Sequence, residues 1–127
     1  MPLLPALAAA MFALCDHSPR ITCVVDGDTF WLAGEKVRIA DINAPETHPA
    51  GCPAELELGE AATRRLIVLL NAGPFELEPI ERERDRYGRL LRTVTRSGRS
   101  LGAQLVSEGL AERWHGRRSD WCALLGG

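Results

Sequence analysis

The sequence predicts a small α+β domain, mainly β, with five strands and two or three helices. Short alternating stretches rich in β-branched residues lie on both sides of one longer stretch with helical spacing. The length of 127 residues and the 46% apolar content are enough for one core. There is no internal repeat or low-complexity run, so we expect a single globular domain over residues 15–127.

Three strands are expected before residue 43. Residues 20–25 (RITCVV) are rich in β-branched side chains and run into the turn-forming DGD. Residues 29–42 (TFWLAGEKVRIADI) read as two apolar-rich arms of a hairpin with Gly34 at the bend. Val37 and Ile39 alternate along the second arm, which places Arg38 on the opposite face.

A helix is expected from Pro53 up to Gly73, because apolar residues recur at helical spacing: Leu58, Ala62, Leu66 and Leu69. Two further strands follow at 75–81 and 88–98, with a charged connection between them. Residues 100–110 predict a shorter helix capped by Ser100. Five short strands with a helix between the third and fourth favour a closed, five-stranded Greek-key barrel of the OB type, which commonly binds oligonucleotides.

The charge is distributed unevenly. The net charge is only -2, but residues 82–99 hold an excess of arginine: Arg82, Arg84, Arg86, Arg89, Arg92, Arg96 and Arg99. Such an excess can meet a polyanion, and arginine forks match phosphate oxygens in pairs. A solvated hairpin with surface salt bridges remains the alternative.

The first 14 residues are apolar and too short to span a bilayer. They have the apolar part and small residues of an export signal but no basic start, so an apolar N-terminal arm packed on the domain is the alternative.

Four cysteines, an even number, fit an oxidising compartment and allow three pairings. Cys15 and Cys23 are close in sequence, which leaves Cys52 with Cys122. We therefore expect a secreted or periplasmic protein, although four reduced thiols in a cytosolic protein stay open. The absence of a CxxC pair argues against structural zinc.

Three polar clusters stand out: DGDT at 26–29, RIADINAPE at 38–46 and DRYGR at 85–89. They offer carboxylates, an arginine near a carboxylate, and a second arginine beside a tyrosine. Phosphodiester hydrolysis uses this combination: a hard cation and arginines bind the phosphate, while a carboxylate prepares the water. Taken singly, each cluster is also compatible with an ordinary turn or a surface ion pair.

With these motifs in this order, residues 20–115 resemble the staphylococcal nuclease-like (thermonuclease) family. The resemblance implies cleavage of DNA and RNA with Ca²⁺. It assigns Arg38, Arg89 and Glu46 to catalysis, the glutamate acting on the attacking water. It assigns Asp28 and the backbone carbonyl of Ala44 to the metal, and gives supporting or nucleotide-binding positions to Asp26, Thr29 and Tyr87.

The sequence departs from this family at Asn43, where a second metal-binding aspartate is usual. An amide oxygen can bind Ca²⁺ but brings no charge, which weakens such a site. Asp41, two residues earlier on the same face of an extended strand, is a candidate to compensate. Mn²⁺ or Mg²⁺ are alternatives to Ca²⁺.

Asn43 also leaves a second function open: a barrel that binds nucleic acid or a protein without cutting it. Arg38, Glu46 and Arg89 favour the nuclease, because a binding module has little use for a glutamate facing a phosphate. Trp114 is a candidate to stack on bases, with a place in the core as the alternative. We expect a monomer that acts on DNA and RNA.

Overall fold

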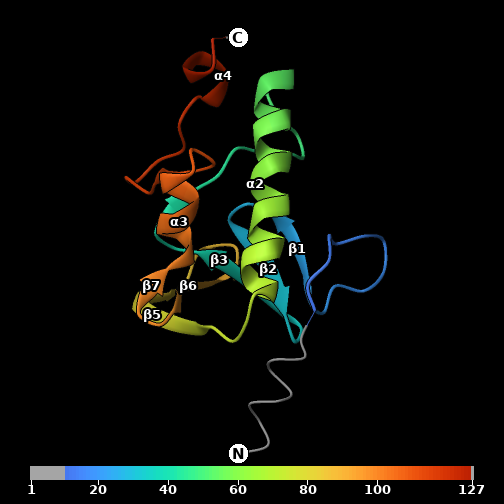
Figure 1. The fold of residues 1–127 in the computed structure, drawn as a ribbon, viewed down its shortest axis with the longest axis vertical. Coiled ribbons are helices and arrows are strands. Elements are labelled where there is room, and N and C mark those ends of the chain that lie inside the picture. The colour runs from blue at the N-terminus through green and yellow to red at the C-terminus, as the bar shows by residue number, and fades with distance from the viewer. Residues whose placement is uncertain (1–10, 127) are drawn as a thin grey trace, which may run out of the picture.

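The computed structural model describes residues 11–126, so the prediction of an export signal lies largely outside the described residues. The helices are α2 (Pro53–Asn71), α3 (Leu101–Ser107) and α4 (Trp121–Leu124). The strands are β1 (Cys23–Asp26), β2 (Thr29–Leu32), β3 (Glu35–Ile39), β4 (Ile42–Asn43), β5 (Glu76–Arg84), β6 (Leu90–Arg96), β7 (Arg99–Ser100) and β8 (Glu112–Arg113). Figure 1 shows α2 standing along the sheet, with α3 beside it and α4 near the C-terminus.

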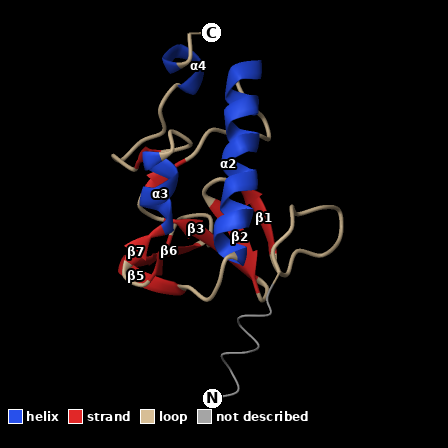
Figure 2. Cartoon of the chain, in the orientation of Figure 1, coloured by secondary structure: helices blue, strands red, loops and turns tan. Residues whose placement is uncertain are grey.

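The strands form one open sheet and one separate pair. Six strands make the larger sheet, in the order β1-β2-β3-β6-β5 with β7 on β6, while β4 pairs with β8. β3 and β6 are parallel, and the other pairs are antiparallel. The α+β class is thus confirmed (Figure 2).

The prediction of a closed five-stranded barrel is wrong. The outer edge of β1 is already occupied, because Val24 donates its N–H to the Ala13 carbonyl and accepts from the N–H of Cys15, at 2.8 and 2.9 Å. Strands of two residues, such as β4, β7 and β8, show no alternation and could not be found from sequence pattern.

The predicted long helix is confirmed as α2. Its buried stripe follows helical spacing through Ala62, Leu66 and Leu70. The turn before β2 touches this stripe: a side chain at Gly27 would lie 2.7 Å from the Ala62 Cβ and 2.8 Å from the Ala44 Cβ. Glycine at 27 therefore lets the DGD turn pack directly on the helix.

The segment before β1 is part of the core. Phe12 is buried, and its ring lies 5.8 Å from that of Phe30 and 6.0 Å from that of Phe75. The Asn71 side chain accepts from the N–H of Phe12 and donates to its carbonyl. Burial of one such ring is worth about 2 kcal/mol, so Phe12 anchors this segment to the core, although Met11 and Leu14 on either side of it are exposed.

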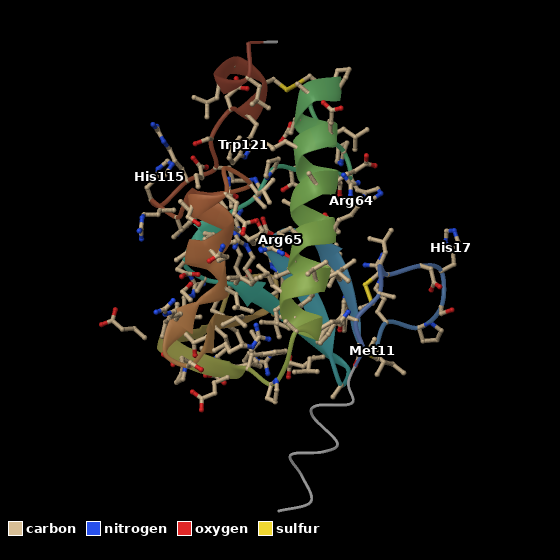
Figure 3. All side chains as sticks on the ribbon, in the orientation of Figure 1. Met11, His17, Arg64, Arg65, His115 and Trp121 are labelled. Atoms are coloured by element: carbon tan, nitrogen blue, oxygen red, sulfur yellow. A yellow bond between two sulfur atoms is a disulfide. The ribbon has the colours of Figure 1, made fainter. Side chains whose placement is uncertain are left out.

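Two disulfides tie down the ends of the domain, Cys15–Cys23 and Cys52–Cys122, which is the pairing that the cysteine spacing favoured. The second joins the start of α2 to α4 (Figure 3). Trp121 of α4 is also buried. The C-terminal segment is thereby fixed near the loop that follows residue 46. Within residues 11–126, no helix combines the length and apolar character needed to cross a membrane.

Candidate active site

Asp28 and Arg38 form the centre of the candidate site. Asp28 directly precedes β2 and Arg38 lies on the neighbouring strand β3, where it is paired with Thr29. Both residues are buried, with 3% and 6% of their surface exposed. An Nη2 of Arg38 lies 3.6 Å from Oδ2 of Asp28. Arg38 therefore pairs with the buried Asp28 and not with Asp41 or Glu35 at the surface.

Backbone groups hold both charged side chains in place. Nη1 of Arg38 donates to the carbonyls of Ile39 and Ile42, the latter at 2.8 Å. Asp28 accepts from Thr29 Oγ1 at 2.9 Å and from the N–H of Ala44 at 2.8 Å. The turn between β3 and β4 is thus built around this pair, which fixes the position of the guanidinium.

Asn43 lies next to this pair and has an oxygen with no partner. The residue is fully buried, its Nδ2 donates to Glu112, and its Oδ1 makes no hydrogen bond. A buried polar atom without a partner is costly, and in a native protein it points to a missing ligand, ion or water. An amide oxygen of this kind is a ligand that a hard cation accepts, and it comes from the residue before Ala44, whose N–H binds the Asp28 carboxylate.

The acidic content of this group is low. Among residues 11–126, no three His, Cys, Asp or Glu side chains gather as they would around a metal. The oxygens that remain are the Asp28 carboxylate, the Asn43 amide and nearby carbonyls. Because the Asp28 carboxylate is the one anionic group among these donors, the donor set suits a weakly bound cation.

Asp26 supports the turn that carries Asp28. Its Oδ1 accepts from the N–H of Asp28 at 3.1 Å. Burial raises the pKa of Asp26 to about 7, and the negative charge of Asp28 adds to this. Asp26 therefore keeps its proton to a higher pH than an exposed aspartate does.

Glu46 follows the Asn43 turn and lies at the edge of the site. Its side chain is one-third exposed and pairs with Arg118 from the C-terminal segment. Its N–H donates to Glu55 Oε2 at 3.0 Å, while Glu55 Oε1 accepts from the N–H of Gly51 at 2.8 Å. Glu55, in the first turn of α2, thus orders the loop that carries Glu46. No motif in the sequence points to Glu55 or Arg118.

Arg89 is held by its own loop. Nε donates to Asp85 Oδ2 at 2.7 Å and the N–H of Arg89 donates to Oδ1 at 2.9 Å. Burial would raise the pKa of Asp85, but the hydrogen bonds from Arg89 outweigh it and lower the pKa. The exposed ring of Tyr87 lies between Arg86 and Arg89, 5.0 and 5.4 Å from their guanidinium carbons.

Arg89 and Arg118 are near enough for their charges to act on Arg38. Burial lowers the pKa of Arg38; the Asp28 carboxylate opposes this, while the positive charges of Arg89 and Arg118 lower the pKa further. Like charges brought together in this way favour a bound anion. A phosphate group, with its charge spread over several oxygens, matches several guanidinium forks.

Two neighbouring residues of the predicted site have clear surroundings. Trp114, the candidate to stack on bases, does not lie in the core: it is 43% exposed, and its ring lies 5.5 Å from the guanidinium carbon of Arg38. Asp41, the candidate to compensate for Asn43, accepts from Ser100 through Oδ2 at 2.6 Å at the N-terminus of α3, while its Oδ1 is buried without a hydrogen-bond partner. Ser100, as predicted, caps that helix by accepting from the N–H of Ala103.

The arginine-rich stretch is not one free basic surface. Arg84 pairs with Glu35 and Arg92 with Glu83. Arg96 donates to the carbonyls of Leu69, Gly73 and Pro74 at the end of α2. Much of the arginine excess is therefore paired with surface carboxylates or, for Arg96, bound to the end of α2, as the salt-bridged alternative supposed.

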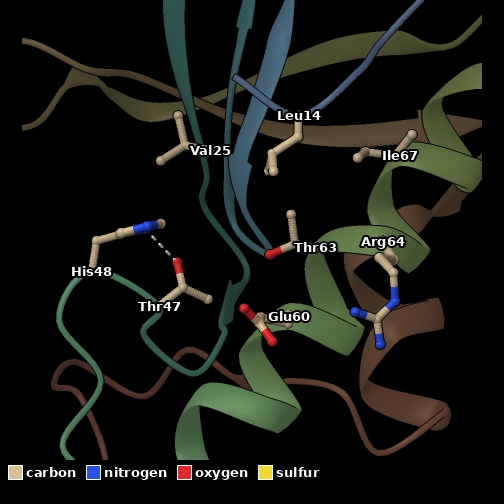
Figure 4. A pocket seen from close by; sticks show the side chains of 8 residues that line it. All are labelled: Leu14, Val25, Thr47, His48, Glu60, Thr63, Arg64 and Ile67. Atoms are coloured by element: carbon tan, nitrogen blue, oxygen red, sulfur yellow. Dashed lines mark hydrogen bonds between the residues drawn. The ribbon is translucent and has the colours of Figure 1, made fainter. Parts of the chain in front are cut away.

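A separate hollow of about 270 Å³ lies between α2, β1 and the loop after Glu46. It is lined by Leu14, Val25, Thr47, His48, Glu60, Thr63, Arg64 and Ile67 (Figure 4). Its lining is mostly apolar, and it contains none of the residues of the Asp28–Arg38 centre. We therefore place the chemistry in the Asp28–Arg38 centre and not in this hollow.

The arginines, with the exposed Trp114 and Tyr87 rings beside them, make this domain suited to bind a phosphate ester that carries a ring. Comparison with known proteins shows the family to which the domain belongs. Residues 36–121 match the family described as "Staphylococcal nuclease homologue". The match covers more than half of the chain, and the protein belongs to the staphylococcal nuclease family.

Individual relatives agree with this assignment. The chain is 40% identical over 93 residues to "Endonuclease YncB" of Bacillus subtilis (strain 168), covering 68% of this chain and 43% of that protein. "SPbeta prophage-derived endonuclease YokF" of the same organism is also 40% identical over 93 residues, with 31% of its length covered. "Protein ParB" of Escherichia coli is 31% identical over 135 residues, covering 89% and 71%. The chain thus spans less than half of the two endonucleases.

Proposed function

We propose that this chain is a metal-dependent endonuclease that hydrolyses phosphodiester bonds of DNA and RNA. The observation that carries the proposal is the burial of Arg38 beside Asp28, together with the buried, unpartnered oxygen of Asn43. Burying charges costs free energy that apolar side chains would not, so this cluster is better explained by a ligand than by the fold. The endonuclease names of two relatives support the same function.

Each residue has a defined part in this proposal. Arg38 and Arg89 bind the scissile phosphate and stabilise the charge that builds up on its oxygens. Glu46 takes a proton from the attacking water, which requires its release from Arg118 when substrate binds. Tyr87 and Trp114 stack on bases without choosing among them, so sequence preference is weak.

Asp28, the Asn43 amide oxygen and the Ala44 carbonyl would hold Ca²⁺, which would act as a Lewis acid on the phosphate. Mn²⁺ or Mg²⁺ are the other candidates for this donor set. Thr29 and Asp26 keep the Asp28 carboxylate in place. The two disulfides fit a secreted or periplasmic protein, and we propose that it acts as a monomer.

The test is digestion of denatured DNA by the oxidised protein, with millimolar Ca²⁺ or with chelator. Glu46→Gln should lower the cleavage rate by about 10²-fold or more, as expected for a lost general base. Glu57→Gln, which removes the same charge from an exposed position on α2, is the matched control and should cleave like the parent. Equal rates for Glu46→Gln and the parent would contradict the assigned role.

A second outcome separates the rival function. If no divalent cation supports cleavage but the protein still binds denatured DNA, the domain is a binding module that has lost its chemistry. Asn43 is the feature that favours this alternative.

A further inference from the structure

Glu112 lies directly opposite Asn43 across the short β4–β8 pair. The register of the two strands pairs Ile42 with Arg113 and Asn43 with Glu112. Directly opposed residues of an antiparallel pair present their side chains on the same face. Nδ2 of Asn43 donates to Oε2 of Glu112 at 2.9 Å.

This hydrogen bond determines which way the Asn43 amide points. An ionised carboxylate only accepts hydrogen bonds, so the NH₂ end of the amide must face Glu112. The other end, Oδ1, is then presented on the opposite side, where it is buried and has no protein partner. If the amide were turned over, its oxygen would face the carboxylate and its NH₂ group would be offered to any cation.

Glu112 is itself held in position. Its Oε1 accepts from Ser119 Oγ at 2.6 Å, and His115 Nε2 lies 3.5 Å from the same oxygen. Ser119 belongs to the C-terminal segment that the Cys52–Cys122 disulfide fixes near α2. These contacts fix the position of the Glu112 carboxylate, and its other oxygen, Oε2, accepts from Asn43.

We propose that Glu112 is a positioning residue that keeps the oxygen of Asn43 facing the cation, which makes asparagine a workable ligand at this position. The inference rests on the proposed function, because it assumes that Asn43 binds a metal ion. It also gives a reason for asparagine: an aspartate at 43 would place two carboxylates against each other across the strand pair.

A double-mutant cycle separates orientation from charge. An aspartate ligand offers an oxygen from either end and needs no orienting group, whereas an asparagine does. In the parent background, Glu112→Ala should weaken Ca²⁺ binding about tenfold, in the range for lost partners of metal ligands. In the Asn43→Asp background, the same Glu112→Ala change should cost nothing. The readout is calorimetric titration of chelator-treated protein with Ca²⁺, with Glu57→Gln as the control for lost charge.

An equal loss in both backgrounds would mean that Glu112 acts only through its charge, and no loss in the parent would mean that it does not act on the site; either result overturns the proposal. The amide ¹H–¹⁵N signals of Asn43 provide a readout without metal. Glu112→Ala should shift them and speed their exchange with solvent, and unchanged signals would also overturn it. If these signals respond but neither parent nor Asn43→Asp binds any divalent cation, the metal-dependent function fails, and the role of Glu112 towards a metal fails with it.

Discussion

Asp28, Arg38 and Asn43 are nearly inaccessible to solvent. Arg38 is held by the carbonyls of Ile39 and Ile42, Asp28 by the N–H of Ala44, and Asn43 by Glu112. In contrast, Tyr87, Arg89 and Arg118 come from loops and are partly or largely exposed. We call these sets the buried half and the exposed half of the site. The buried half has its geometry before any ligand arrives. The exposed half is held by local side-chain partners that a substrate can replace.

The difference indicates a division of labour. Groups that meet the reacting phosphate gain from being fixed in advance, because no reorganisation is then needed during the reaction. Groups that meet the rest of a flexible, single-stranded chain gain from being able to follow it. Substitutions in each half test this division, because their effects on folding stability and on cleavage should differ.

The largest loss of folding stability is expected for Arg38→Ala. The change leaves the buried Asp28 carboxylate without its ion-pair partner and removes two hydrogen bonds to carbonyls. Removal of one partner of a buried pair costs about 3 kcal/mol or more. Urea denaturation of the oxidised, metal-free protein should show this loss; an unchanged midpoint would mean that Arg38 is not part of a pre-formed structure.

A smaller change in folding stability is expected for Asp26→Asn, and its size should depend on pH. The pKa of Asp26 is raised to about 7 by burial and by Asp28. The folded protein therefore keeps a proton that the unfolded chain has lost, so stability falls as the pH rises from about 4 to 7. The amide that replaces the carboxyl group can still accept from the N–H of Asp28 but does not ionise.

Asp26→Asn should thus be the more stable protein at pH 8, by about 2 kcal/mol in the absence of metal. Unfolding curves between pH 5 and pH 8 with chelator present provide the comparison. Parallel pH profiles for the variant and the parent would rule out the raised pKa.

The smallest effect on stability is expected for Arg89→Ala. Its ion pair with Asp85 is local and partly exposed, and such pairs contribute less than about 1 kcal/mol. Cleavage of denatured DNA should nevertheless fall by about 10²-fold, because a group that meets the phosphate is lost. A large loss of stability would place Arg89 in the buried half, and normal cleavage would remove it from the site.

Sequence pattern predicted the long elements of this fold and failed on the short ones. The 19-residue helix α2 has several turns over which apolar residues recur, and its bounds were close to those expected. Strands β4 and β8 have two residues each, so they carry no periodicity, yet their pairing brings Glu112 to Asn43. The closed-barrel prediction failed at the edge of β1, where Val24 pairs with Ala13 and Cys15, a contact that no local pattern encodes.

The candidate site shows the same limit. Asp28 and Arg38 lie within recognisable motifs, and the structure brings them together. Asp41 shares a face with Asn43 in an ideal strand, but the chain turns between β3 and β4 and takes its carboxylate to Ser100. Arg118 reaches Glu46 from the far end of the domain sequence. Such partners follow from tertiary packing and from the second disulfide rather than from spacing.

The most direct test of the two halves is the cleavage rate of Arg38→Lys measured beside that of Arg89→Lys under identical Ca²⁺ conditions. Lysine keeps the positive charge but lacks the planar fork that reaches two carbonyls and a phosphate at once. We expect Arg38→Lys to lose at least about tenfold more activity than Arg89→Lys, because only Arg38 of the two is fixed by buried hydrogen bonds. Equal losses, or a greater loss at Arg89, would contradict the division into a buried half that fixes the phosphate and an exposed half that follows the substrate.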